Sequence, residues 1–321
     1  QQGQQQQQQQ QNDGGPGPAM SFEGEWPLSR KVKLVAFDLD GTLLDPEGKL
    51  TTFTRSALQT VFGSGGGGAP SIAIVTGRTL GAVPYQEVPG REVYVVSSNG
   101  SQVSLWRPPT ATEVGRLEDL RATRFSAAQT QAVLALAGPG QCEAVWCSAD
   151  GRTMEVLAYS DDAREKTRTF NNPDGKRFVT CFHDSMQSTA VVIFILTSDP
   201  DGWVEKAGKV LPQNMLHGPG KIAITNYKPK PLVALQPAGM DKGVALRQLC
   251  DELGIALDET IAFGDGINDV EFLEAAGCGI APSNAVDEAK RAADVVLQLS
   301  NGEDAVAKAL LELHGAGHFA S

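Results

Sequence analysis

Two groups of carboxylate side chains in the 321-residue chain each come directly after a short apolar run. The first group is Asp38 and Asp40, which follow residues 33–37 and precede Gly41. Side chains two positions apart in an extended chain point to the same side, and a glycine then allows a sharp turn. Paired carboxylates can act as nucleophile and acid, or as metal ligands. An isolated Asp-x-Asp is also common in surface turns, so the preceding apolar run is what favours a functional pair.

The second group is the segment 264–269 (GDGIND), which follows the apolar residues 261–263. Asp265 or Asn268 could instead cap the helix that the next apolar residues predict. A cap accounts for one polar side chain, whereas this segment also contains Asp269. In an open parallel sheet, ligands bind beyond the carboxyl ends of the strands, so both groups are expected to meet at one edge.

Four carboxylates at one sheet edge repel one another, and a hard divalent cation with oxygen ligands relieves that repulsion. Magnesium takes few protein ligands and keeps positions open for water and for phosphate oxygens. The two groups therefore predict a Mg2+ site that is suited to phosphoryl chemistry.

Three further segments place polar residues at the ends of expected strands or helices. Segment 75–78 (VTGR) offers a hydroxyl and backbone amides that suit an anionic oxygen, although a simple helix cap explains it equally well. Lys242 lies in the first turn of the predicted amphipathic helix 241–254, where a cation opposes the helix dipole, and this favours a phosphate partner. Segment 98–100 (SNG) is better explained as a turn.

The elements that must position these residues follow from apolar runs that alternate with helical patterns. Buried strands are predicted at residues 32–37, 71–75, 93–96 and 260–263. Between the first two strands, the residues at helical spacing are Phe53, Ala57, Leu58 and Val61. Gly254 is expected to end the helix that contains Lys242. This order predicts an α/β fold with a parallel sheet and helices on both of its faces.

The middle of the chain, residues 101–237, has a different pattern. Turns are predicted at 107–109, 138–140, 172–175 and 199–202, and strands at 143–147, 154–158 and 190–196. The chain is about twice as long as a typical domain of roughly 150 residues. We therefore predict a core domain formed by residues 31–100 and 238–321, with a second domain, residues 101–237, inserted into it.

Composition limits the remaining possibilities. Residues 1–30 form a tail rich in Gln, Gly and Pro, which is expected to be disordered. The net charge of −11 makes nucleic acid an unfavourable partner, and no apolar run approaches the roughly 20 residues of a membrane span. The five cysteines lack paired spacing, so they are predicted to be buried structural residues in a reducing compartment. A cytoplasmic location is expected, with a plastid or mitochondrial transit peptide left open.

Four segments in this order, FDLDGTLL, IVTGR, DKG and GDGIND, resemble the haloacid dehalogenase superfamily of phosphotransferases. The stretch SSNG and the later GCGIAPSNAVDEAKRAAD are similar to the Cof-type hydrolases. The resemblance covers residues 32–100 and 238–313. It implies a Rossmann-like parallel-sheet core with an inserted α+β cap domain that covers the site and selects the substrate.

The resemblance also implies catalytic roles. Asp38 would be the nucleophile that forms an aspartyl-phosphate. Asp40 would protonate the leaving oxygen and then activate water. The phosphate group would be held by Thr76, Gly77, Lys242 and Asn268.

By the same resemblance, Mg2+ would bind Asp38, the main-chain carbonyl of Asp40, and Asp265. Asn268 and Asp269 would complete this shell or orient it. The resemblance does not assign these two roles separately to Asn268 and Asp269.

A magnesium-dependent phosphatase of small phosphorylated metabolites is therefore the leading hypothesis, with sugar phosphates or a phosphorylated flavin or pyridoxal cofactor as substrates. A sugar phosphomutase is the alternative within the superfamily, and the compact segment 264–269 favours the hydrolase over it. A catalytically silent sugar-phosphate-binding protein is the alternative from another class, although no motif carboxylate is replaced. Lys221, Lys228 and Lys230 are expected to be solvated surface residues rather than substrate contacts.

Overall fold

The computed structural model describes residues 22, 24–63, 69–89, 91–171, 179–182, 189–212, 215, 223–226 and 231–319. Several predictions concern residues outside these ranges: most of the N-terminal tail, the turn at 172–175, and the three lysines Lys221, Lys228 and Lys230. All statements below refer to the described residues.

The larger of two sheets has the strand order β14-β13-β12-β1-β2-β3-β4-β5. From β14 to β3 the neighbouring strands are parallel, and β4 and β5 add an antiparallel edge. The bounds are β1 Leu34–Phe37, β2 Ser71–Val75, β3 Val93–Ser97, β4 Gln102–Arg107, β5 Arg116–Ala122, β12 Thr260–Phe263, β13 Cys278–Ala281 and β14 Val295–Val296. The four predicted core strands and the parallel sheet are thus confirmed.

The chain changes direction in this sheet at β1. After β1 it builds β2 and β3 on one side, and it later returns to build β12, β13 and β14 on the other side. The end of such a central strand is the point where open α/β sheets bind ligands, because the connections on its two sides leave a crevice there. Asp38 is the first residue after β1.

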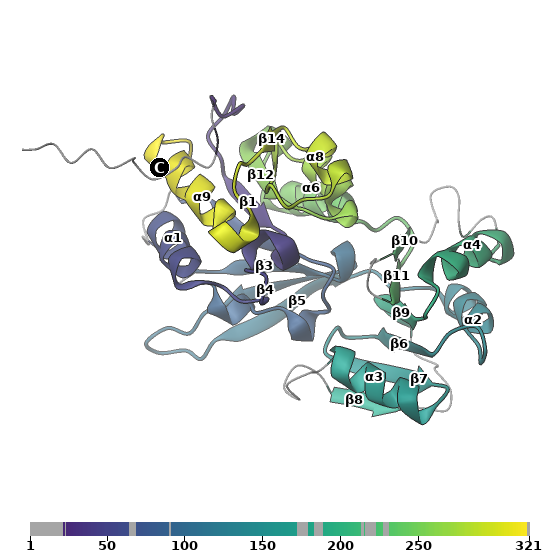
Figure 1. Cartoon of the computed structure of the whole chain (residues 1–321). Coiled ribbons are helices and arrows are strands. Elements are labelled where there is room, and N and C mark those ends of the chain that lie inside the picture. The colour runs from purple at the N-terminus through teal and green to yellow at the C-terminus, as the bar shows by residue number, and fades with distance from the viewer. Residues whose placement is uncertain are drawn as a thin grey trace, which may run out of the picture.

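Helices cover both faces of the larger sheet, as predicted (Figure 1). Helices α1 (Thr52–Phe62) and α9 (Ala305–Gly315) lie side by side on one face. The other face is covered by α6 (Lys242–Leu253), α7 (Val270–Ala275) and α8 (Asp287–Ala292). Successive side chains of β1 point to opposite faces of the sheet and fill both cores. Val35 and Phe37 belong to the core under α1 and α9, and Leu34 and Ala36 belong to the core under α6 and α7.

One predicted core position of α1 is not buried. Ala57, Leu58 and Val61 lie in the core, whereas Phe53 is 43% exposed. Phe53 is in the first turn of α1, where Thr51 caps the helix through the backbone N–H of Thr54. The apolar stripe of this helix therefore begins one turn later than its sequence spacing predicts.

The smaller sheet has the strand order β10-β11-β9-β6-β7-β8 and lies to one side of the larger sheet (Figure 1). Its strands are antiparallel except for the pair β7 and β8. The bounds are β6 Ala144–Ser148, β7 Thr153–Ala158, β8 Val179–Phe182, β9 Val192–Leu196, β10 Ala223–Asn226 and β11 Leu232–Gln236. Helices α2 (Ala127–Leu136) and α4 (Pro200–Val210) cover one face, and α3 (Asp161–Asn171) packs on the other. This is the expected inserted α+β unit.

The hairpin of β4 and β5 belongs to the larger sheet, although its residues fall within the predicted inserted domain. Strand β4 pairs with β3 immediately after the turn at Ser98–Gly100. A turn-rich sequence does not reveal which sheet its strands join, and this is why residues 102–122 were assigned to the insertion. The division into domains at residues 100 and 101 stays a prediction, but the strand pairing places the change of sheet after residue 122.

The predicted turn at 199–202 is wrong, because these residues begin helix α4. The side chain of Asp199 caps the helix by accepting the backbone N–H of Gly202 at 2.9 Å. Pro200 occupies the first helical position, where its fixed φ suits the helix and its missing N–H leaves no bond unmade. Asp and Pro are common both in turns and at the first positions of helices. These four residues alone therefore do not distinguish a turn from the start of a helix.

The described cysteines Cys142, Cys147, Cys250 and Cys278 are free thiols. Cys147, Cys250 and Cys278 are buried in the cores, as predicted. Burial raises the pKa of Cys147 and of Cys278 to about 12, which leaves both thiols protonated and unreactive.

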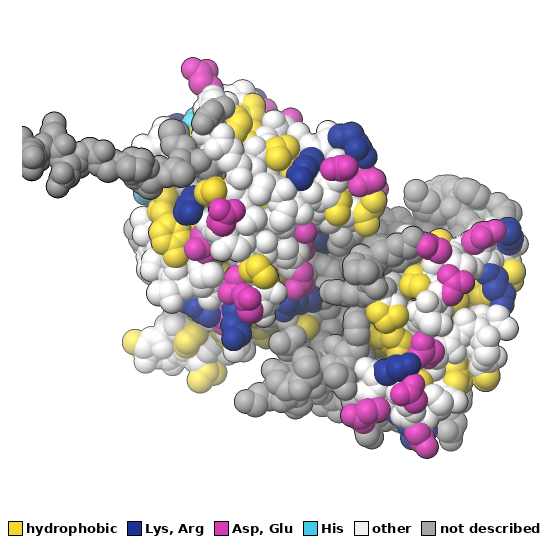
Figure 2. All heavy atoms as spheres, viewed as in Figure 1, with side chains coloured by type: hydrophobic (Ala, Val, Ile, Leu, Met, Phe, Trp, Pro, Cys, Tyr) yellow, Lys and Arg dark blue, Asp and Glu magenta, His cyan; other side chains and the backbone are white. Residues whose placement is uncertain are grey.

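Figure 2 shows acidic and basic side chains interspersed over the visible described surface. Some exposed pairs lie within one helix, such as Lys209 with Glu205 on α4. Within the described ranges, no helix combines the length and apolar character needed to cross a membrane.

Candidate active site

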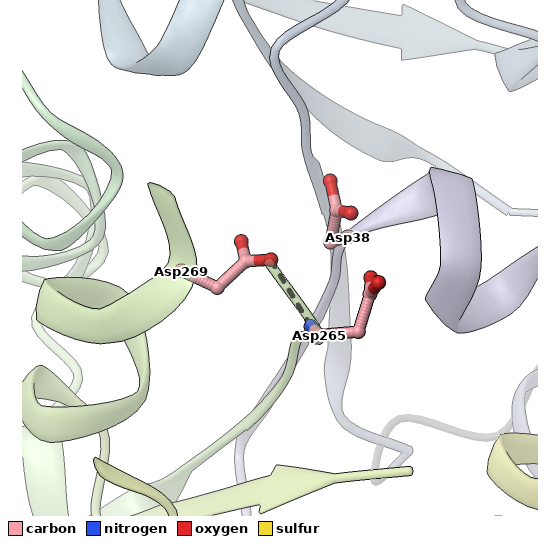
Figure 3. Close-up of side chains that lie close together, drawn as sticks. All are labelled: Asp38, Asp265 and Asp269. Carbon is pink, nitrogen blue, oxygen red and sulfur yellow. Dashed lines mark hydrogen bonds between the residues drawn. The ribbon is translucent and has the colours of Figure 1, made fainter. Parts of the chain in front are cut away.

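Three carboxylates gather where the central strands end. Asp38 follows β1, Asp265 follows β12 by two residues, and Asp269 comes directly before α7. One oxygen from each lies within 4.8 Å of the others. Strands β1 and β12 are adjacent and pair Phe37 with Phe263, so the residues after them emerge side by side. Figure 3 shows the three side chains together, with Asp269 turned toward the backbone of Asp265.

Lys242 is the cation of this cluster. It is the first residue of α6, as predicted, and its side chain is fully buried. Its Nζ donates to Oδ1 of Asp38 at 2.7 Å and to Oδ1 of Asp269 at 2.5 Å. Asp241 caps the helix by accepting the backbone N–H of Val244 at 2.7 Å. The unfavourable placement of a lysine at a helix N-terminus is thus offset by two buried carboxylates.

The charges in the cluster do not balance. Burial raises the pKa of Asp38 well above its usual range, and the nearby charges of Asp269 and Asp265 add to this effect while Lys242 opposes it. Burial also raises the pKa of Asp265 to about 6, against a hydrogen bond from Thr42. For Lys242, burial alone would lower the pKa, but the two carboxylates outweigh it and raise the pKa. One lysine therefore faces three carboxylates, and this oxygen donor set fits a hard divalent cation.

A tight turn over residues 39–43 fits closely around Asp265. The hydroxyl of Thr42 donates to Oδ1 of Asp265 at 2.6 Å. Gly41 has φ of +82°, and a Cβ at this position would lie 2.2 Å from Oδ2 of Asp265. The amide of Asn284 donates to the carbonyl of Gly41 at 2.8 Å. Thr42 and Asn284 were not predicted as site residues, although both lie in the quoted motif segments.

Asp269 has both carboxylate oxygens engaged. Oδ1 accepts from Lys242, and Oδ2 accepts the backbone N–H groups of Asp265 and Gly266 at 3.1 and 2.8 Å. No side-chain cap is formed at α7 within the described structure, so the alternative of Asp265 or Asn268 as a simple helix cap is wrong. Asp269 instead fixes Lys242 relative to the backbone at residues 265 and 266.

Asn268 connects this segment to the end of β3. Its Nδ2 donates to Oδ1 of Asn99 at 2.9 Å. Ser98 and Asn99 have φ of +52° and +51°, so the turn predicted at 98–100 is confirmed. The backbone N–H of Asn99 donates to the carbonyl of Thr76 at 3.0 Å. The predicted turn is therefore also a bridge between two motif segments, which the sequence did not indicate.

Thr76 and Gly77 lie at the same sheet edge, after β2. Thr76 is buried, and its hydroxyl accepts the backbone N–H of Arg78 at 3.1 Å. Strand β2 pairs with β1 by placing Ile74 opposite Phe37. The residues that follow β2 thus emerge next to Asp38, at the sheet edge where the sequence places them.

Asp40 lies outside the group of three carboxylates whose oxygens are within 4.8 Å of one another, although its charge adds to the raised pKa of Asp265. Its carboxylate pairs with Arg78, whose Nε and Nη2 donate to Oδ2 and Oδ1 at 2.7 and 2.6 Å. Burial alone would lower the pKa of Arg78, but the hydrogen bond and charge of Asp40 outweigh it and raise the pKa. The sequence motif VTGR contains Arg78, but nothing in it indicates which carboxylate this long side chain reaches.

The model of the haloacid dehalogenase-like hydrolase family matches residues 35–310. The chain belongs to this family. It is 24% identical over 277 residues to the pyridoxal phosphate phosphatase YbhA of Escherichia coli, a match that covers 86% of this chain and 96% of that protein. It is 51% identical over 69 residues to the phosphoglycolate phosphatase of Methanopyrus kandleri, which covers only 22% of this chain and 30% of that protein.

The fold also matches solved structures of the family. The structure of BT1666 from Bacteroides thetaiotaomicron superimposes with a TM-score of 0.68 at 22% sequence identity. This match covers 89% of the chain and 96% of BT1666. At that level of identity the likeness establishes the fold, which is therefore confirmed over both sheets.

Proposed function

We propose that this chain is a magnesium-dependent phosphatase that hydrolyses small phosphorylated metabolites through an aspartyl-phosphate on Asp38. The main observation in favour is the buried cluster of Asp38, Asp265 and Asp269 bridged by Lys242 at the end of β1. Membership of a hydrolase family and the match to nearly all of the phosphatase YbhA support the same reaction.

In the first step, a carboxylate oxygen of Asp38 attacks the phosphorus in line with the leaving oxygen. The new bond joins Asp38 to phosphorus, and the bond from phosphorus to the leaving oxygen breaks. Asp40 gives its proton to that oxygen, so the product leaves as an alcohol. Lys242, next to Asp38, offsets the negative charge that the two reactants share.

In the second step, a water molecule attacks the phosphorus of the aspartyl-phosphate. Asp40, now a carboxylate, takes a proton from this water. The bond between Asp38 and phosphorus breaks, which releases inorganic phosphate and restores the free carboxylate. Thr76 and Gly77 at the end of β2, together with Asn268, would hold the phosphate oxygens during both steps.

Asp38, Asp265 and the main-chain carbonyl of Asp40 are the proposed ligands of Mg2+. When bound, the ion offsets the repulsion between the phosphate group and the carboxylates. Asp269 has both oxygens engaged, so its proposed task is to hold Lys242 and the backbone after Asp265.

Pyridoxal 5′-phosphate is the first substrate to test, because YbhA is named for its action on it and matches most of this chain. Hexose phosphates and a flavin phosphate complete the panel. The purified chain is expected to release phosphate from at least one of them with Mg2+, and chelation should stop this release. Full activity in excess chelator would contradict the metal site.

The same assay separates the two alternatives. Conversion of a hexose 1-phosphate to its 6-phosphate isomer without phosphate release would identify a phosphomutase. Binding of metal and ligand with no turnover of any ester would identify a silent binding protein. Trapping of a phosphoryl group on Asp38, absent in Asp38→Asn, would support the covalent mechanism.

A further inference from the structure

We propose that Arg78 is a positioning residue for Asp40, because its guanidinium holds the two carboxylate oxygens of Asp40 through two separate hydrogen bonds. This inference rests on the proposed function, in which Asp40 exchanges protons with the leaving oxygen and then with water. Arg78 itself would not touch the substrate.

The contact between the two side chains has the geometry of a bidentate pair. Nε and Nη2 of Arg78 donate to the two different oxygens of Asp40 at 2.7 and 2.6 Å. Such a fork fixes both the place and the plane of a carboxylate, which a single hydrogen bond does not. The side chain of Asp40 is half-exposed, so solvent alone does not fix its orientation.

Arg78 is itself held firmly, so it can serve as a fixed support. Its side chain is only 17% exposed, and Nη1 donates to the carbonyl of Ala82 at 3.1 Å. Its backbone N–H donates to Thr76, and its carbonyl accepts from the N–H of Ser98 at 2.8 Å. The backbone of Arg78 is therefore anchored to the residues after β2 and β3, and its guanidinium to the carbonyl of Ala82.

The loop after Arg78 is also tied to the smaller sheet. The backbone N–H of Gly81 donates to the carbonyl of Gly151, in the turn between β6 and β7, at 2.8 Å. Gly81 is next to Ala82, whose carbonyl accepts the third hydrogen bond of Arg78. The loop that supports Arg78 therefore contacts the inserted unit. Contact between the two sheets and the placement of Asp40 are linked through this loop.

The leaving group decides which step of the reaction needs Asp40. An alkyl ester needs a proton on its leaving oxygen, so the placement of Asp40 matters in both steps. An activated aryl phosphate needs no proton in the first step, and it therefore isolates the dependence of the second step on Arg78.

The test follows the pre-steady-state hydrolysis of an aryl phosphate by Arg78→Met. We expect the first release of aryl alcohol to be nearly unchanged and the later steady rate to fall about 10- to 100-fold, a part of the roughly 100- to 10,000-fold that acid–base catalysis provides. The aspartyl-phosphate should accumulate and be trapped. Arg78→Lys should recover part of the steady rate, because it restores one donor but not the fork.

Two controls decide between positioning and other roles. In an Asp40→Asn background, Arg78→Met should have no further effect, since its target is gone. Arg55→Met is the matched control on α1, where Arg55 likewise contacts a carboxylate and a carbonyl of Glu87, and its kinetics should equal those of the wild type.

The inference and the proposed function fail in different ways. If the wild-type chain forms no phosphoenzyme, the proposed function is wrong. If it does, but Arg78→Met and Arg78→Lys slow both steps equally or raise KM in the Asp40→Asn background, Arg78 is a substrate-binding or structural residue and the inference is overturned.

Discussion

The site at the end of β1 and the contact between the two sheets are held together by different kinds of interaction. In the site, Lys242 is fully buried and bonded to two buried carboxylates. Between the sheets, Arg152 at the start of β7 pairs with Asp119 of β5, and the two side chains are 40% and 48% exposed. Buried charge pairs resist separation, whereas exposed pairs contribute little. The ion pair between the sheets therefore contributes less to stability than the buried pairs of the site do.

The loop that contains Arg78 contacts both the site and the smaller sheet. It is bonded to Asp40 on one side and, through Gly81, to the turn at Gly151 on the other. Buried ion pairs thus hold the proposed catalytic residues, and more exposed contacts join them to the inserted unit, which is expected to select substrates.

The largest effects are expected when the two motif aspartates are altered separately. Asp38→Asn should abolish turnover and the covalent intermediate with every ester, because the nucleophile is gone. Asp40→Asn should still form the intermediate from an aryl phosphate and then hydrolyse it slowly. Rapid-quench kinetics with an aryl and an alkyl phosphate measure both steps. Identical losses for both variants and both esters would contradict the assignment of Asp40.

The second prediction compares a buried and an exposed lysine. Lys242→Met should lower the free energy of unfolding by about 3–5 kcal/mol without metal, because it leaves Asp38 and Asp269 buried without their cation. Lys209→Met on α4 removes an exposed pair with Glu205, and it should cost less than about 1 kcal/mol. Urea unfolding monitored by circular dichroism measures both. If both variants lost the same free energy of unfolding, the buried cluster around Lys242 would be no more rigid than the exposed pair on α4.

The sequence was sufficient for the site residues that follow a strand directly. Asp38 and Asp265 were predicted because strand ends in a parallel sheet converge whatever their side chains do. Lys242 was predicted for a different reason, because a cation in the first turn of a helix opposes the helix dipole. The pairing of Arg78 with Asp40 was not, since the reach of a long side chain depends on the tertiary position of both partners. The sheet to which β4 and β5 belong was missed for a similar reason, because pairing partners are set by the whole fold.

The third prediction tests the close fit of the 39–43 turn around Asp265. Gly41→Ala places a Cβ that would lie 2.2 Å from the Asp265 carboxylate, at a φ of +82° that alanine adopts unfavourably. The concentration of Mg2+ needed for half-maximal activity should rise about tenfold, which corresponds to about 1.4 kcal/mol.

Gly254→Ala is the matched control for this substitution. Gly254 ends α6 at a φ of +64°, with no heavy atom within 4 Å of an added Cβ. The Gly254→Ala variant should lose about 1 kcal/mol of unfolding free energy, because alanine adopts this left-handed backbone conformation unfavourably. The concentration of Mg2+ that it needs should not change. A shift in the Mg2+ requirement of both variants would mean that strain, rather than contact with Asp265, is responsible.

The smallest effect is expected for the ion pair between the sheets. Arg152→Met and Asp119→Asn should each change the free energy of unfolding by less than about 1 kcal/mol, because both side chains are largely exposed. Each should nevertheless alter the ratio of kcat/KM for pyridoxal 5′-phosphate to that for a small aryl phosphate by a few-fold, since the pair is one of the contacts between the smaller sheet and the larger one. Combining the two substitutions should add nothing further.

This pair also has a defined pH dependence. Hydrogen bonds from Arg152 hold the pKa of Asp119 below its usual range, with burial opposing them. A lowered pKa in the folded state means that the contribution is complete above the unfolded value of about 4 and is lost as the pH falls through the lower folded value. Between pH 5 and 8 the difference in stability between wild type and Asp119→Asn should therefore stay constant, and it should shrink below about pH 4. A difference that instead changes between pH 6 and 8 would show that another group, not this carboxylate, holds the two sheets together.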